Sequence, residues 1–179
     1  IDYTTSFFGT ALVRLADRTG KAAYADYGLK FGTSFVAADG SIRTYQREDY
    51  NIDNIPPGKV LLLAWERGDR SPALKQAIDT LYAQMQTHPR TSDGGFWHKL
   101  RYPNQMWLDG LFMAEPFAAE YSLIFNHPEH FDHIAKQFAL IEKYAVDPKT
   151  GLVYHAYDES KEQKWADPKT GLSPHFWSR

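Results

Sequence analysis

The segment from Met106 to Tyr121 constrains the fold of this chain more than any other part of it. Apolar residues occupy nearly every face of a helix drawn over this segment, namely Trp107, Leu108, Leu111, Phe112, Met113, Ala114, Phe117, Ala118 and Ala119. A helix that is apolar all round is buried on most of its sides. Asp109 lies inside the run, where a carboxyl group must be paired, hydrogen-bonded or held protonated. Asp109 is therefore the leading candidate for a catalytic group.

Composition indicates a single globular domain without a nucleic-acid or membrane partner. The 179 residues are 43% hydrophobic and 23% charged, with a net charge of −2 at pH 7. A chain of this length can bury a hydrophobic core. Its acidic and basic residues nearly balance, which disfavours nucleic-acid binding. The absence of cysteine excludes disulfides, thiolate catalysis and cysteine-bound metal. No apolar run could span a membrane and no signal peptide is visible, so we expect a cytoplasmic protein, with the periplasm as the alternative.

Helical periodicity recurs on both sides of the central run. Apolar residues at helical spacing predict helices over residues 3–20, 22–36, 56–67, 71–85 and 127–144. Gly28 and Gly32 predict close helix packing, and residues 41–45 and 152–157 alternate like short strands. The chain starts and stops inside such patterns. We therefore expect residues 1–179 to form one partial domain with sequence missing at both ends.

Turn glycines reveal a long repeat. Gly40, Gly95 and Gly151 are spaced 55 and 56 residues apart, and each precedes a short alternating segment and then a pair of helices. One helix pair per ~50 residues is typical of a helical array or toroid, with buried inner helices and amphipathic outer ones. The duplicated DPKTGL, at 147–152 and 167–172, is only 20 residues apart and is interpreted as recurring turn chemistry.

In such a toroid the loops that lead into inner helices meet at one rim. This places one group of side chains in a shared shallow cleft: Asp53, His98, Lys99, Trp107, Asp109, Tyr154, His155, Phe176, Trp177 and Arg179. Aromatic faces among hydrogen-bonding groups suit a sugar, and cations suit an acidic sugar.

Four segments resemble glycoside hydrolase family 105, the unsaturated rhamnogalacturonyl hydrolases, which are similar to the unsaturated glucuronyl hydrolases of family 88. The segments are NIDNIPPGK, GGFWHKLRYPNQMWLDGLFMAEPFAAEY, LVYHAYDES and SPHFWSR. The resemblance covers nearly the whole chain, and MWLDGLFMAEPF is its most specific block. It implies an all-α fold, the (α/α)6 barrel or six-hairpin toroid, of which this chain contains about half.

The resemblance also implies a bacterial pectin-degrading activity. These enzymes release the 4,5-unsaturated galacturonyl residue from lyase-generated rhamnogalacturonan oligosaccharides by hydrating the C4=C5 enol ether. Asp109 matches the family's general acid/base, and Asp53 matches its second active-site aspartate. The expected substrate-binding residues are His98, Lys99, Trp107, His155, Trp177 and Arg179. No cofactor or metal is implied, and the oligomeric state stays open.

Other interpretations remain open from the residues alone. Asp53 and Asp109 could cap helices, and the histidines and tryptophans could be packing residues. Glu115 is interpreted as structural. The seven histidines form neither an HxxxH nor an HExxH pair, so we expect no zinc site.

Three other functions are alternatives to an unsaturated rhamnogalacturonyl hydrolase. The nearest is an unsaturated glucuronyl hydrolase acting on glycosaminoglycan or gellan fragments. A second is conventional inverting hydrolysis, with Asp53 and Asp109 as base and acid. A third is a non-catalytic helical-repeat module that binds carbohydrate.

Overall fold

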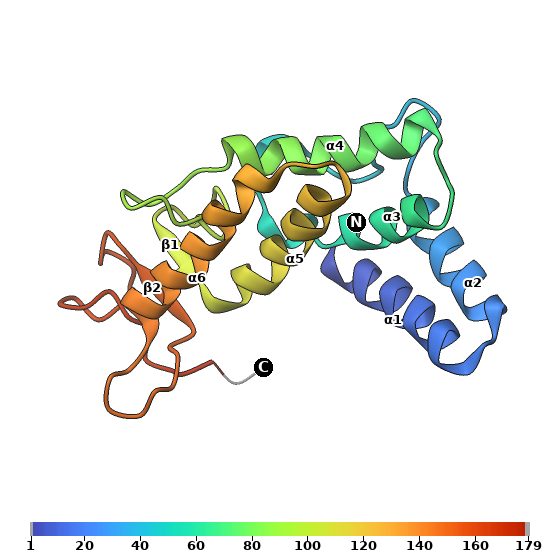
Figure 1. Cartoon of the computed structure of the whole chain (residues 1–179). Helices are drawn as coiled ribbons and strands as arrows, with labels where there is room; N and C mark the ends of the chain where they lie inside the picture. The colour runs from blue at the N-terminus through green and yellow to red at the C-terminus, as the bar shows by residue number, and fades with distance from the viewer. Residues whose placement is uncertain (1, 178–179) are drawn as a thin grey trace. The chain divides into compact units, whose positions relative to one another are not determined.

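The computed structural model describes residues 2–177, which are mostly helical (Figure 1). Its elements are α1 (Tyr3–Thr19), α2 (Ala22–Thr33), η1 (Arg47–Asp49), η2 (Ile52–Asn54), α3 (Pro57–Glu66), α4 (Pro72–Thr87), β1 (Gln105–Trp107), α5 (Leu108–Ile124), η3 (Pro128–His130), α6 (Phe131–Ala145) and β2 (Ala156–Asp158). The chain forms two compact units. Unit 1 contains the chain up to Glu48 together with Asp53–Thr87, and unit 2 contains Asp49–Ile52 and the chain from His88 onward.

In unit 1, helices α1, α2 and α3 approach one another through glycine. A Cβ atom at Gly28 would lie 2.7 Å from the carbonyl oxygen of Gly9 in α1. One at Gly32 would lie 2.5 Å from Cγ1 of Val60 in α3. Both distances are shorter than van der Waals contact, so neither position has room for a side chain. The prediction that Gly28 and Gly32 mark close packing is confirmed.

The ends of α1 and the proline start of α3 follow the sequence prediction, whereas the predicted cap of α3 does not. Asp2 caps α1 by accepting the backbone N–H of Thr4 at 3.0 Å. Gly20 ends α1 in the left-handed conformation, with φ 69°, and donates its N–H to Ala16. The N-cap of α3 is Pro56, and no side chain caps that helix. A capping role for Asp53 at α3 is therefore wrong.

Unit 2 packs α5 against α6 over an apolar core. Met106, Leu140, Ile141 and Ala145 are buried at its centre. β1 pairs with β2 in antiparallel register, with Trp107 opposite Ala156. Burial of α5 is less complete than its sequence predicts, because the side chains of Phe112 and Leu123 are 48% and 76% exposed. None of the described helices combines the length and apolar character needed to cross a bilayer.

The predicted repeat appears as recurring turns. Each turn is flanked by one isolated antiparallel bridge: Val36–Ile42, Arg90–Phe96 and Val146–Val153. The left-handed residue of the second turn is Gly94 and not Gly95. Gly95 is required for another reason, because a Cβ atom there would lie 2.3 Å from the Met106 sulfur. The segment 41–45 predicted as a strand forms only a single bridge, and of 152–157 only its end belongs to β2.

The duplicated DPKTGL forms the same turn twice. The backbone N–H of Asp147 donates to Leu152 at 2.8 Å, and that of Asp167 donates to Leu172 at 2.9 Å. Each aspartate also accepts hydrogen bonds from the turn that it opens, which holds the pKa of both carboxyl groups below the ordinary value. The interpretation as recurring turn chemistry is confirmed.

Candidate functional site

The start of α5 is held by its neighbouring strands. Trp107 is the last residue of β1 and the extended N-cap of α5, and it makes no side-chain capping bond. The backbone N–H of Leu108 donates to the carbonyl oxygen of His155 at 3.0 Å. β1 therefore runs directly into α5 and places Asp109 in the first helical turn, with the segment before β2 beside it.

Asp109 is half buried and lies within the helix. Because the N-cap is Trp107, Asp109 does not cap α5. Its Oδ1 atom is buried and accepts no hydrogen bond from the part of the chain that the structure describes. A buried carboxyl oxygen without a partner is costly in a purely structural role. The role of Asp109 as a general acid/base stays a prediction.

Three rings form an aromatic stack beside Asp109, with Trp107 between the other two. The rings of His98 and Trp107 are stacked at 4.4 Å between centroids, and those of Trp107 and Tyr102 at 5.4 Å. His155 lies against Trp107 at 5.3 Å in a tilted arrangement. Three of the residues expected at the cleft, His98, Trp107 and His155, are thus brought together within unit 2. Tyr102 joins them, although the sequence analysis did not assign it to the site.

Hydrogen bonds fix the stack in place. The backbone N–H of His98 donates to Gln105 at 2.7 Å, and its carbonyl oxygen accepts from Ile52 at 3.1 Å. Trp107 Nε1 donates to the side-chain oxygen of Gln105 at 3.1 Å. His98 is 2% exposed, so it supports Trp107 from behind, whereas Trp107 is only half buried.

The other residues predicted for the site lie outside the aromatic stack or outside the described part of the chain. Lys99 Nζ lies 5.9 Å from the centre of the Tyr102 ring, next to the aromatic stack. Trp177 is 39% exposed and its backbone N–H donates to Val153. Arg179 lies outside the described residues. Asp53 is half buried in η2 and belongs to unit 1, so its pairing with Asp109 stays a prediction.

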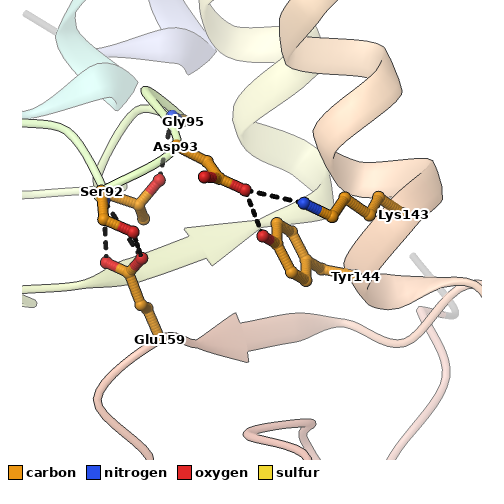
Figure 2. A network of polar contacts seen from close by, with 7 residues as sticks. Ser92, Asp93, Gly95, Lys143, Tyr144 and Glu159 are labelled. Atoms are coloured by element: carbon orange, nitrogen blue, oxygen red, sulfur yellow. Dashed lines mark hydrogen bonds and ion pairs between the residues drawn. The ribbon is translucent and has the colours of Figure 1, made fainter.

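A polar network anchors the turn that precedes His98 (Figure 2). Asp93 accepts a hydrogen bond from Lys143 Nζ at 2.8 Å and another from the Tyr144 hydroxyl, both on α6. These bonds, that from Lys143 first, lower the pKa of the Asp93 carboxyl. Glu159, just after β2, accepts hydrogen bonds from the backbone N–H and the hydroxyl of Ser92. The turn is thus tied to α6 and to the end of β2.

Comparison with known proteins decides the family. The model described as Glycosyl Hydrolase Family 88 matches residues 1–179. The chain belongs to this family. A solved structure from C. acetobutylicum, a glycoside hydrolase from family 105, is 40% identical with a TM-score of 0.93, covering 98% of this chain and 49% of that one. These findings confirm the family resemblance and the all-α, (α/α)6-type fold of which about half is present.

Curated relatives of this family 88 chain are bacterial. The unsaturated rhamnogalacturonyl hydrolase YesR of Bacillus subtilis is 25% identical over 134 residues, which are 72% of this chain and 37% of YesR. Protein Atu3128 of Agrobacterium fabrum is 39% identical over 67 residues, which are 37% of this chain and 28% of that protein. The chain therefore spans half or less of the relatives that it matches.

The family 88 chain also contains a buried polar group that sequence reasoning left as structural. Glu115 on α5 is 2% exposed, and burial raises the pKa of its carboxyl to about 8, against the opposing effect of Arg90. Arg90 Nη1 lies 2.8 Å from His133 Nε2 and 3.2 Å from the carbonyl oxygen of Gly94. The sequence did not single out Glu115, because it is one of three acids in α5, with Asp109 and Glu120.

Three side chains at the connection between α5 and α6 could hold a metal ion. Nδ1 of His127 lies 3.0 Å from Glu129 Oε1, and Nε2 of His130 lies 3.5 Å from the same oxygen. The search for HxxxH and HExxH spacing missed this H-P-E-H arrangement. Glu129 is exposed and His127 is half buried, and a histidine–carboxylate pair at this distance is explained by hydrogen bonding between the side chains themselves.

Proposed function

We propose that this protein is an unsaturated rhamnogalacturonyl hydrolase. It would release the 4,5-unsaturated galacturonyl residue from oligosaccharides that a lyase has made from rhamnogalacturonan. The observation that carries the proposal is the Asp109 carboxyl oxygen, which is buried and has no hydrogen-bond partner among the described residues, two positions after Trp107 of the aromatic stack. Membership of family 88 and the similarity to YesR support it.

The reaction is a hydration that one carboxyl group can catalyse. The Asp109 carboxyl group gives a proton to C4, while the oxygen of a water molecule bonds to C5. A proton from that water passes to the Asp109 carboxylate, which restores the acid. The hemiketal formed at C5 then opens spontaneously and expels the neighbouring sugar. The double bond is lost, and no external oxidant or reductant takes part.

Substrate binding follows from the same residues. The half-buried ring of Trp107, supported by His98, offers a flat apolar face to the sugar ring. His155, tilted against Trp107, and Trp177 add hydrogen-bonding and aromatic groups. Lys99 and Arg179 would bind the uronate carboxylate, and Asp53 would hold the attacking water or the sugar hydroxyls. The reaction would take place in the cytoplasm or, alternatively, in the periplasm.

A direct assay tests this proposal. Lyase-derived unsaturated disaccharides from rhamnogalacturonan and from glycosaminoglycan or gellan are incubated separately with the protein, and the ultraviolet absorbance of the conjugated uronate is followed. We expect the absorbance of the rhamnogalacturonan product to decay fastest. Faster decay of the glucuronyl substrates would assign the glucuronyl activity instead, and decay of neither would overturn the hydratase. Release of sugar from saturated glycosides would indicate conventional inverting hydrolysis.

A further inference from the structure

The connection from α5 to α6 in unit 2 brings two histidine nitrogens to one carboxylate oxygen. Nδ1 of His127 lies 3.0 Å from Glu129 Oε1, and Nε2 of His130 lies 3.5 Å from the same atom. One ligand atom from each of the three residues lies within 4.8 Å of the others. Three groups that can bind a metal ion therefore share one small volume.

Hydrogen bonding accounts for only one of the two short distances. The 3.0 Å between His127 and Glu129 is that of an ordinary hydrogen bond. The 3.5 Å between His130 Nε2 and Glu129 Oε1 exceeds the usual range of roughly 2.7–3.2 Å for such a bond. Two ligands of a tetrahedral zinc ion, each about 2.0–2.2 Å from the metal, lie about 3.3–3.5 Å apart. The second distance is therefore that of a coordination edge.

The turn itself holds the two histidines in place. The backbone N–H of His127 donates to Ser122 at 2.8 Å, and that of His130 donates to His127 at 3.2 Å. Between them, Pro128 begins η3. The ring of His127 stacks on that of Tyr121 at 5.8 Å and on that of His130 at 5.4 Å. Ligands held in this way lose little conformational freedom when an ion binds.

The chemistry of the three groups selects the class of ion. Imidazole nitrogen suits Zn²⁺, Cu²⁺ and Ni²⁺, whereas Ca²⁺ and Mg²⁺ prefer oxygen ligands. Hydrogen bonds from its own backbone N–H and from His127 lower the pKa of the Glu129 carboxyl, which is therefore ionised at pH 7. The Glu129 side chain is 60% exposed, so a water molecule can supply a fourth ligand.

We propose that His127, Glu129 and His130 form a binding site for a divalent transition-metal ion of the zinc class. The ligands are His127 Nδ1, Glu129 Oε1 and His130 Nε2, with water as the fourth. The metal replaces the proton that His127 Nδ1 donates to Glu129, and this proton exchanges with the solvent. Each imidazole coordinates through one nitrogen only, so its other nitrogen keeps its present partner, as is usual for metal-bound histidine.

This inference does not depend on the proposed function. Asp109 lies in the first turn of α5, and His127 follows the end of that helix. At a rise of about 1.5 Å per residue, the length of α5 between them is on the order of 22 Å. The ion would therefore stabilise the connection between α5 and α6, and it would not touch the reacting sugar.

Calorimetric titration of the chain with zinc chloride tests the proposal. We expect one equivalent of Zn²⁺ to bind. At a free Zn²⁺ concentration a hundredfold above the dissociation constant, the Tm should rise by about 5–10 °C. His127→Gln, Glu129→Gln and His130→Gln should each weaken binding at least about tenfold and reduce the rise in Tm. His175→Gln, which removes an exposed histidine elsewhere in unit 2, is the control and should bind Zn²⁺ as the wild type does.

NMR of the wild type with Co²⁺ gives a second readout that needs no variant to fold. The paramagnetic ion should shift the ring signals of His127 and His130 and leave those of His175 in place. Equal Zn²⁺ affinity in the wild type and the three ligand variants would overturn the inference, as would Co²⁺ shifts at His175 alone. Turnover does not report on this site, so inactivity on every oligosaccharide would count against the proposed function only.

Discussion

In unit 1, α1, α2 and α3 meet through glycine and apolar side chains, whereas in unit 2 the region between α5 and α6 encloses polar groups. Val60 fills the space that Gly9 and Gly32 leave open. Around Phe96, by contrast, lie the guanidinium of Arg90 at 4.2 Å and the rings of His88 and His133 at 5.4 and 5.2 Å. Steric fit governs the first region. In the second region, burial shifts the pKa values of His88, His133 and Glu115, and this is the region that carries the candidate chemistry.

If unit 2 carries the catalytic groups, substitution of Asp109 should have the largest effect on activity. Asp109→Asn should reduce turnover by about 10²- to 10⁴-fold, because the amide cannot donate and recover the proton. Substrate binding should be retained, which equilibrium dialysis would measure beside the ultraviolet assay. Asp132→Asn, an exposed acid on α6, is the matched control. Unchanged function in Asp109→Asn would favour a non-catalytic binding module.

Acidification should destabilise unit 2 through its buried histidines. Burial lowers the pKa of His88 to about 4, and its Nε2 lies 2.8 Å from the carbonyl oxygen of Trp97. Because the unfolded histidine binds its proton near pH 6.5, the stability that comes from neutral His88 is present above that pH and is lost as pH falls toward 4. We expect a loss of up to about 3 kcal/mol in urea unfolding.

The control for this pH effect is His88→Gln, which keeps a donor for Trp97 and cannot titrate. Its free energy of unfolding should fall less between pH 6.5 and pH 4.5 than that of the wild type. Burial also lowers the pKa of His133 to about 4, so part of the acid sensitivity should remain in this variant. An equal loss in both proteins would assign the sensitivity to other groups.

The steric character of unit 1 predicts a cost for one added methyl group. Gly32→Ala should lower the free energy of unfolding by about 1–3 kcal/mol, because the new Cβ atom meets the branched Val60 side chain. Alanine favours a helix over glycine, so a stabilised variant would show that α2 and α3 can separate at no cost. Asp26→Ala, exposed on the same helix, should change stability by less than about 0.5 kcal/mol.

The smallest effect is expected for the surface ion pair of unit 1. Arg67 and Asp17 are 2.7 Å apart, with side chains 38% and 58% exposed. Arg67→Ala should change the free energy of unfolding by less than about 1 kcal/mol, and the difference should shrink further in high salt. A larger, salt-insensitive loss would show that the Arg67 stem contributes through packing.

The sequence predicted most elements because their signals are local. Apolar spacing and proline starts placed the helices, and Gly20 marked the end of α1. The family motif supplied Trp107, His98 and His155, whose rings the fold brings together in unit 2, and Asp109, whose role stays a prediction. The capping alternatives for Asp53 and Asp109 are wrong, because the N-caps of α3 and α5 are Pro56 and Trp107.

Other features depend on contacts between distant residues and could not be read from the sequence. The lack of room for a side chain at Gly95 follows from the position of the Met106 sulfur. The short pairing of β1 with β2 joins residues about fifty positions apart. Glu115 was assigned a structural role because its burial becomes visible only when α5, α6 and the turn before His98 are packed together.

By itself, the sequence determined that an acid would stand at the start of a helix too apolar to be exposed, and which chemistry that motif resembles. The tertiary structure decided which side chains surround that helix. It stacked His98 behind Trp107, left one oxygen of Asp109 without a hydrogen-bond partner among the residues that the structure describes, and buried Glu115, which raises its pKa to about 8. The physical reason is that helix periodicity is a property of neighbouring residues, whereas desolvation and protonation depend on every segment that packs around a group.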